Sequence, residues 1–393
     1  MSPSLTNLRS RARVSARLEG LLDRTPAPAL EPFTWTELKT PLAIFAASRV
    51  YVFFILLAVT KVLNYPLTQL LGGWDSKWYV SIAQQGYVSS VPPGHGDLAQ
   101  CNLGFFPLLP VLIRTVHTLS PLDWLVSGVI ATTITGFAAS IAIWLLLRSR
   151  FAIAPSTRAI ALAIFSPGAF VLSLVYSEGL IITFACFTLL ALQRRHWIAA
   201  GLFAALTSLA DPVGVAAVFA CVLTAIVAIE KDRNTDPLAA VIIAPLGIVG
   251  FFTYLYFHTG DFFSWFIAQR TGWQGGYYFS GIPRAFYEFA VHGFSTFNSA
   301  IKAISVLVAL LLVWLLVKTR PALSLMAYAG FIFFLGALSP VIAITPRLLL
   351  RNTPLVATLG AQLTKKTYYV FLAISIACLG FLTIVSASPQ WTP

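Results

Sequence analysis

The sequence has few charged residues and few cysteines, and both shortages narrow the class of protein. Only 10% of its 393 residues are charged, whereas 58% are hydrophobic, and the mean hydropathy is +0.82. This composition excludes an ordinary soluble globular protein and indicates a polytopic membrane protein. The four cysteines form no CxxC pair, so nothing indicates a disulfide framework or a zinc site. We interpret them as small buried apolar side chains.

Motifs for nucleotides and metals are missing as well. No GxxxxGK[ST] or GxGxxG stretch occurs, so nothing indicates a nucleotide as energy source or direct donor. The histidines lack the spacing of metal ligands, and we expect neither a metal nor a cofactor. A net charge of +12 would suggest a nucleic acid partner in a soluble protein. Here we expect none, because the sidedness of the basic residues accounts for that charge.

Eleven apolar segments are long enough, or nearly long enough, to cross a membrane. They are 42–63, 124–147, 158–176, 178–193, 197–210, 212–229, 238–257, 301–317, 322–343, 346–362 and 368–386. Several are shorter than the ~20 residues of a perpendicular span, so we expect some to be paired, broken or re-entrant. The segment 103–119 contains two prolines and Arg114, and we expect it to lie at the membrane interface without crossing.

The basic residues predict the orientation. They concentrate in the N-terminal tail and in short connections on one side, at 148–158, 194–195, 231–233, 318–320 and 365–366. The positive-inside rule then predicts a cytoplasmic N-terminus in the plasma membrane, about 11 transmembrane helices and an outer C-terminus. We expect a basic cytoplasmic tail at 1–41 and a single transmembrane domain at 42–393. Its outer loops would be 64–123, with interfacial helices, and 258–300.

On this topology the unusual polar residues collect on the outer side. Acids at the ends of apolar segments are costly unless they are paired, so we treat them as candidate functional residues. The candidates, with their aromatic and basic neighbours, are Trp74, Asp75, Lys77, Trp78, Glu178, Asp211, Asp261, Gln269, Arg270, Arg347 and Arg351.

Two of these features indicate chemistry. Asp75 lies among aromatic residues typical of a membrane boundary, where a shielded carboxylate can act as a general base. Arg347 and Arg351 are four residues apart, on one helical face, and guanidinium groups suit a phosphate. Alternatively, Asp75, Glu178 and Asp211 cap helices, and the two arginines snorkel to the interface. Together the outer acids and arginines favour an enzyme with a lipid-phosphate substrate.

Several stretches resemble a known family. WDSKWYVSIAQQGY (74–87) followed by NLGFFPLLPVLIR (102–114) resembles the signatures of the PIG-V-like mannosyltransferases, which include GPI mannosyltransferase II enzymes and bacterial relatives. SPGAFVLSLVYSEGL (166–180), GDFFSWFIAQRTGW (260–273) and PRLLLRNTPL (346–355) are similar to later segments of that family, in the same order. The chain departs from the family at Asp211-Pro212, where relatives often carry Arg-Pro.

The resemblance implies a GT-C glycosyltransferase fold and an inverting transfer on the extracytoplasmic side. The donor would be a polyprenyl-phosphate sugar, usually mannose, and the acceptor a hydroxyl of a glycolipid, lipoglycan or protein. Asp75 would then be the general base, and Arg347 with Arg351 would hold the donor phosphate. Glu178 and Gln269 would contact sugar hydroxyls or orient the outer loops.

Two other classes of function stay open. A transporter or flippase of a lipid-linked substrate also needs an outward cavity lined by broken helices. Against it stand the lack of an inverted repeat and the placement of the acids on one side. A catalytically degenerate scaffold subunit is the third possibility, suggested by the charge reversal at Asp211. The sequence predicts membrane lipid as a partner and leaves the acceptor and the oligomeric state open.

Overall fold

The computed structural model describes residues 32–273, 279–319, 321–339 and 343–387, and these residues form helices and no strand. Residues 1–31 of the predicted tail at 1–41 lie outside the described residues. So do residues 274–278 of the second predicted outer loop.

The α-helices are α2 (Lys39–Leu63), α3 (Leu67–Leu71), α4 (Ser76–Gln85), α5 (Leu108–Leu119), α6 (Trp124–Arg148), α7 (Ile153–Ile164), α8 (Glu178–Gln193), α9 (Trp197–Ala210), α10 (Val215–Asp232), α11 (Leu238–Ile243), α12 (Leu246–Thr259), α13 (Ser264–Gly272), α14 (Gly281–His292), α15 (Phe297–Thr319), α16 (Leu323–Leu338), α17 (Pro346–Arg351), α18 (Thr353–Gly360) and α19 (Lys365–Val385). The 3-10 helices are η1 (Trp35–Leu38), η2 (Gly96–Ala99), η3 (Asn102–Gly104), η4 (Pro167–Ser173) and η5 (Pro212–Gly214).

Six stretches in the described part of the chain are helical, long and apolar enough to cross a membrane, and α7 with η4 makes a seventh if the bent pair is one span. They contain α2, α6, α10, α11 with α12, α15 and α19. Further apolar helices, α5, α8, α9 and α16, are shorter. The protein is therefore a multi-pass membrane protein by the length and composition of its helices. The count of eleven spans stays a prediction.

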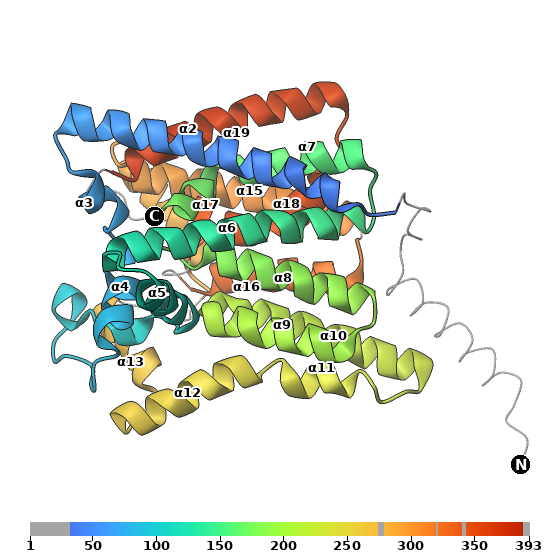
Figure 1. Ribbon diagram of the computed structural model, residues 1–393, viewed down its shortest axis with the longest axis horizontal. Helices are drawn as coiled ribbons and strands as arrows, with labels where there is room; N and C mark the ends of the chain where they lie inside the picture. The colour runs from blue at the N-terminus through green and yellow to red at the C-terminus, as the bar shows by residue number, and fades with distance from the viewer. Residues whose placement is uncertain (1–31, 274–278, 320, 340–342, 388–393) are drawn as a thin grey trace, which may run out of the picture.

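Helix α8 lies at the centre of the bundle, between α6 and α9 (Figure 1). Nearly all of its residues are buried, which requires close approach of its neighbours. Small residues permit this approach: a side chain at Gly179 would collide with Thr135 and the backbone of Gly136 on α6. Such small-residue contacts are the usual way in which membrane helices pack tightly. Beyond α6 lies α2, and beyond α9 lie α11 and α12.

Short helices gather at one end of this bundle. In Figure 1, α3, α4, α5 and α13 lie at the end where α6 begins, and α5 is seen end-on while α6 runs across the view. Helix α5 has 12 residues and packs against α4 and α6. It is thus shorter than a perpendicular span needs, as α8, α9 and α16 also are, and its place at the membrane interface stays a prediction.

A break between α7 and η4 shapes the region beside α17. The two helices are bent by 74°, and Pro167 at the first position of η4 lacks the N–H that a continuing helix would use. Gly168 then lies directly against the Pro346 carbonyl at the start of α17, where a Cβ would overlap it. From α2, Arg49 Nη1 donates to the Ala169 carbonyl at 2.7 Å and to Ser173 Oγ at 2.8 Å, which holds η4 in place.

Candidate functional site

Five of the predicted residues meet in one ion-pair cluster. Asp75 directly precedes α4, Glu178 is the first residue of α8, and Asp211 follows α9. Arg347 and Arg351 come from α17, one turn apart, as their spacing predicts. The chain therefore brings together side chains that are up to about 270 positions apart in the sequence. We call these five residues the acid–arginine cluster.

Arg347 bridges the first two acids. Its Nη1 donates to Asp75 Oδ2 at 2.5 Å, and its Nε donates to Glu178 Oε1. Its guanidinium carbon lies 4.5 Å from the centre of the Tyr176 ring, within reach of a cation–π interaction. Two of the three guanidinium nitrogens thus donate to carboxylates, and an aromatic ring lies near the group.

Arg351 links the second and third acids. Its Nε and Nη2 donate to Glu178 Oε1 at 3.1 and 2.9 Å, and Nη2 also donates to Asp211 Oδ2 at 2.8 Å. One oxygen of Glu178 therefore accepts from both arginines. Because a planar guanidinium donates in several directions at once, two arginines can connect three carboxylates in this way.

The cluster contains one more acid than it has arginines. The second oxygen of Glu178, Oε2, is buried and has no hydrogen-bond partner among the described residues. Burial also raises the pKa of Asp211 above its ordinary value, against the opposing effect of Arg351 and Arg347. Buried polar atoms without partners are uncommon in folded proteins, and they frequently mark functional sites.

Exposure is highest at the Asp75 end of the cluster. The side chain of Asp75 is 22% exposed and that of Arg347 is 15% exposed. The values decrease to 9% for Arg351, 7% for Asp211 and 0% for Glu178. A ligand that approaches the cluster from its accessible side therefore meets Asp75 and Arg347 first.

The contacts of these residues can be compared with the capping and snorkelling alternatives. Asp75 occupies the N-cap position of α4, but its side chain makes no capping hydrogen bond and points to Arg347 instead. Asp211 does cap η5, because its Oδ1 accepts from the Val213 N–H at 2.9 Å, and it pairs with Arg351 as well. The arginines do not snorkel away from the protein, because both are turned into the cluster.

Hydrogen bonds from the loop before α8 hold Asp75 in place. The Tyr176 hydroxyl accepts from the Asp75 N–H at 3.4 Å, and Ser76 Oγ accepts from the Val175 N–H at 3.2 Å. One helical turn further on, the hydroxyls of Tyr79 and Ser177 are 3.1 Å apart. These supporting residues did not emerge from the sequence analysis as site residues. Tyr176 and Ser177 directly precede Glu178 in the chain, which is the signal that points to them.

Three further predicted residues flank Asp75 without joining the cluster. The Trp74 indole donates to the Ser386 carbonyl at 3.1 Å, and its φ of 52° is rare for a bulky residue, so the chain turns sharply just before Asp75. Lys77 is exposed, and its ammonium lies 4.8 Å from the centre of the Trp78 ring. Trp78 stacks on Phe105 at a centroid distance of 6.0 Å.

The predicted residues of the second outer loop have other contacts. Asp261 Oδ1 accepts from the Phe263 N–H at 2.7 Å in the turn that leads into α13. Gln269 Nε2 donates to the Gly104 carbonyl at 3.1 Å, which fastens α13 to η3. Arg270 is exposed. The structure thus gives Asp261 and Gln269 local packing roles, and the role of all three residues at a substrate stays a prediction.

The donor set of the cluster suits anions and hydroxyls better than a metal. Within the described ranges, no three histidine, cysteine, aspartate or glutamate side chains are grouped so that they could hold a metal ion. The two guanidinium groups are instead the natural partners of a phosphate or carboxylate. A comparison with protein-family models finds no family that matches the chain, and a comparison with curated proteins finds no relative.

Proposed function

We propose that this protein is a membrane glycosyltransferase that moves a sugar, mannose by resemblance, from a polyprenyl-phosphate donor to a hydroxyl of a glycolipid, lipoglycan or protein acceptor. The observation that carries the proposal is the contact between Asp75 and Arg347. A proton acceptor and a phosphate-binding group lie side by side at the accessible edge of an otherwise buried cluster. The resemblance of residues 74–87 and 346–355 to the PIG-V-like mannosyltransferases supports the same function.

The mechanism begins with an exchange of partners. The donor phosphate takes the place of Asp75 at Arg347 Nη1, because the two anions compete for the N–H groups of that nitrogen. Asp75, released from its ion pair, then accepts the proton of the acceptor hydroxyl. The acceptor oxygen attacks C1 of the sugar, and the C1–O bond to the phosphate breaks, with its electron pair leaving on the phosphate. Arg347 stabilises that leaving charge, and a single displacement inverts C1.

The buried residues of the cluster position Arg347 in this scheme. Glu178 accepts from Arg347 Nε, and Arg351 holds Glu178 in turn. Rigid support of this kind keeps a phosphate-binding group in its productive geometry. The free Oε2 of Glu178 is available to accept from a hydroxyl of the bound sugar.

The arrangement of charge supports an extracytoplasmic site in the plasma membrane. Helix α6 ends at Arg148, and Arg195 follows the end of α8. Figure 1 shows these two helix ends on the side of the bundle away from α4 and α5. Under the positive-inside rule that end is cytoplasmic, so the cluster belongs to the outer half. We keep the eleven-span topology and the GT-C fold as part of this proposal.

One observation favours a second candidate, a transporter or flippase of a lipid-linked substrate. Arg49 lies inside the first span and is bonded to η4, and α7 and η4 form a span that is bent by 74°. Broken helices with a nearby charge are typical of transport pathways. The glycosyltransferase is preferred because the carboxylates gather with arginines at one edge and not along a path.

The experiment uses membranes that contain the protein and its natural acceptors, with radiolabelled polyprenyl-phosphate mannose as donor. Asp75→Asn is expected to lower transfer by about 10²–10⁴-fold, the usual contribution of a general base. The same variant is expected to bind the donor more tightly, because no carboxylate competes for Arg347. The matched control is Asp97→Asn, at an exposed carboxylate of the same predicted outer loop, which should keep normal transfer.

Opposite results would decide against the proposal. Normal transfer by Asp75→Asn removes Asp75 as the base. If the wild-type protein transfers no label but moves the labelled donor across reconstituted vesicles, the protein is a transporter. A wild-type protein that does neither fits the scaffold alternative.

A further inference from the structure

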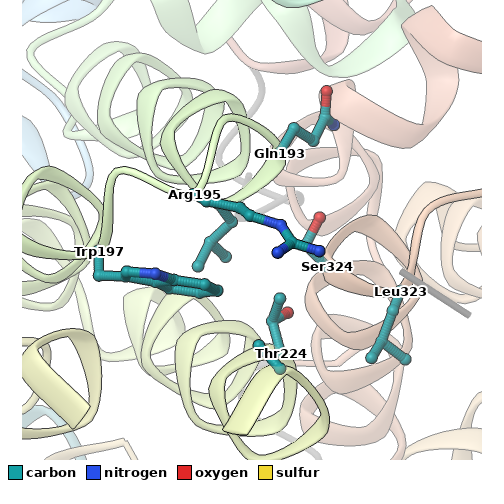
Figure 2. A pocket seen from close by; sticks show the side chains of 8 residues that line it. Gln193, Arg195, Trp197, Thr224, Leu323 and Ser324 are labelled. Carbon is teal, nitrogen blue, oxygen red and sulfur yellow. The ribbon is translucent and has the colours of Figure 1, made fainter. Parts of the chain in front are cut away.

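A small cavity lies at the opposite end of α8 from the acid–arginine cluster. Figure 2 shows it where the end of α8, the start of α9, the middle of α10 and the start of α16 meet. Glu178 begins α8 and Gln193 ends it, and the helix has 16 residues. At about 1.5 Å per residue, the cavity is about 22 Å from the cluster. It is therefore a separate site, and its ligand does not depend on the proposed function.

Positive charge converges on this cavity from three sources. The Arg195 guanidinium extends over it, between Trp197 and Ser324 (Figure 2). Helix α9 begins at Trp197, and α16 begins at Leu323, so two helix N-termini border the cavity. The first N–H groups of a helix have no partner within it and carry partial positive charge. Such an arrangement favours an anion.

A buried hydroxyl provides an independent sign of a ligand. The side chains of Thr183, Thr188 and Thr207 each donate to the carbonyl four residues earlier in their own helix. Thr224 also lies inside a helix, but its Oγ1 is buried and has no hydrogen-bond partner in the described part of the chain. The residue as a whole is 4% exposed and lines the cavity. Such an atom needs a polar partner, which a water or an oxygen of a ligand in the cavity can supply.

The size and surroundings of the cavity restrict the ligand. Its volume is about 30 Å³, more than the ~10–15 Å³ that one water molecule needs. This space suits a small polar group. The outer faces of α9 and α10 beside it are apolar, with Ile198 62% exposed and Leu202 and Ile226 each 52% exposed. Exposed apolar side chains next to an anion site fit the acyl chains of a lipid.

We propose that this cavity binds the phosphate group of an anionic phospholipid. The phosphate oxygens accept from Arg195, Thr224 and the N-terminal N–H groups of α16, and the acyl chains lie along α9 and α10. On the predicted topology this end of the bundle faces the cytoplasmic leaflet, which carries anionic lipids.

Substitutions of Asp232 and Thr224 are expected to change phospholipid affinity in opposite directions. Its Oδ2 accepts from Arg195 Nη1 at 2.7 Å, so this carboxylate competes with a phosphate for the same guanidinium. Asp232→Asn is therefore expected to strengthen phospholipid binding. Thr224→Val removes the buried hydroxyl without touching that ion pair, and it is expected to weaken binding. A purely structural role of either residue would not give opposite signs.

The measurement is native mass spectrometry of the full-length protein in detergent. The probes are phosphatidylglycerol, phosphatidylcholine with the same acyl chains, and inorganic phosphate. We expect the wild type to prefer phosphatidylglycerol, and Arg195→Ala and Thr224→Val to weaken its binding about tenfold, the effect of one lost hydrogen bond to a charged group. Asp232→Asn should tighten binding by a similar factor. Arg233→Ala, an exposed charge outside the cavity, serves as the control.

Each outcome supports or overturns the proposal. If an excess of inorganic phosphate does not displace bound phosphatidylglycerol, the ligand is a lipid. Inorganic phosphate that binds with the same dependence on Thr224, while the lipid does not, overturns the lipid and leaves a soluble phosphate as the ligand. Lipid binding that none of the variants changes overturns the site altogether, and the cavity then holds water. Should Arg195→Ala fail to fold, the opposite signs of the other two variants still decide.

Discussion

The two ends of the helix bundle contain ion pairs of similar length in different surroundings. At the end that contains α4 and α5, the acid–arginine cluster is largely buried, and Glu178 has no exposed side-chain surface. At the other end, Arg195 and Asp232 form a pair at 2.7 Å whose side chains are 45% and 30% exposed. Distance alone therefore does not distinguish a pair that fastens two helices from a network that holds reactive groups. Burial and the balance of charge do.

The difference teaches what each arrangement is for. An exposed pair contributes about 0–1 kcal/mol, because water solvates its charges in any case. A buried network gains little over apolar packing, although removal of one member costs several kcal/mol. A contribution to stability therefore does not explain well why three carboxylates and two arginines are gathered in one buried cluster. A role in binding or chemistry explains them better, and three experiments test the contrast.

The largest effect is expected from Arg351→Met. The substitution leaves Glu178 and Asp211 buried next to each other with only Arg347 nearby, which should cost about 3–5 kcal/mol of unfolding free energy. Its matched control, Arg195→Met, should cost about 0–1 kcal/mol. Thermal unfolding of both variants in the same detergent, followed by tryptophan fluorescence, measures the difference. If the two variants shift the unfolding temperature equally, the buried cluster and the exposed pair do not differ in their contribution to stability.

A smaller effect is expected where η4 meets α17. A Cβ at Gly168 overlaps the Pro346 carbonyl, so Gly168→Ala should displace α17 and cost about 1–3 kcal/mol, the usual range for overpacking. Gly330 in α16 has open space around the position of a Cβ, and Gly330→Ala should be tolerated. The same unfolding assay compares the two variants. Gly168→Ala that behaves like Gly330→Ala would contradict the close packing of these segments.

The smallest effect is expected from salt. A double-mutant cycle on Arg195 and Asp232 should give a coupling of about 0.5 kcal/mol that falls as sodium chloride rises from about 0.05 to about 0.5 M. A cycle on Arg347 and Asp75, which are 15% and 22% exposed, should change less over the same range. If salt weakens both couplings equally, water reaches the cluster as freely as it reaches the outer pair.

Much of the fold follows from hydropathy, because a span must be apolar over its whole length. Over its described residues, each of the eleven predicted segments overlaps a helix or a pair of consecutive helices, such as α11 and α12 for the segment 238–257. The sequence also predicts that Arg347 and Arg351 share a face, since that depends only on local helix geometry.

The contacts between distant segments could not be predicted in the same way. Nothing in the stretches around Asp75 and Arg347 indicates that the two side chains touch, because their distance depends on how α4 packs against α6 and how α17 packs against α8. The same limit applies to Gln269, which the sequence places among candidate substrate contacts. In the structure its side chain fastens α13 to η3, a contact that a position in the chain does not predict, and its role at a substrate stays a prediction.

The order of the cluster along the chain has a consequence for how the protein is made. Synthesis delivers Asp75, Glu178 and Asp211 long before it delivers Arg347 and Arg351. Until α17 has been synthesised, the three acids lie at the ends of apolar helices without their arginine partners. Unpaired charges of this kind are unfavourable in a lipid environment. Insertion of α17 therefore completes the bundle late, and a chain truncated before Pro346 is a natural target for membrane quality control.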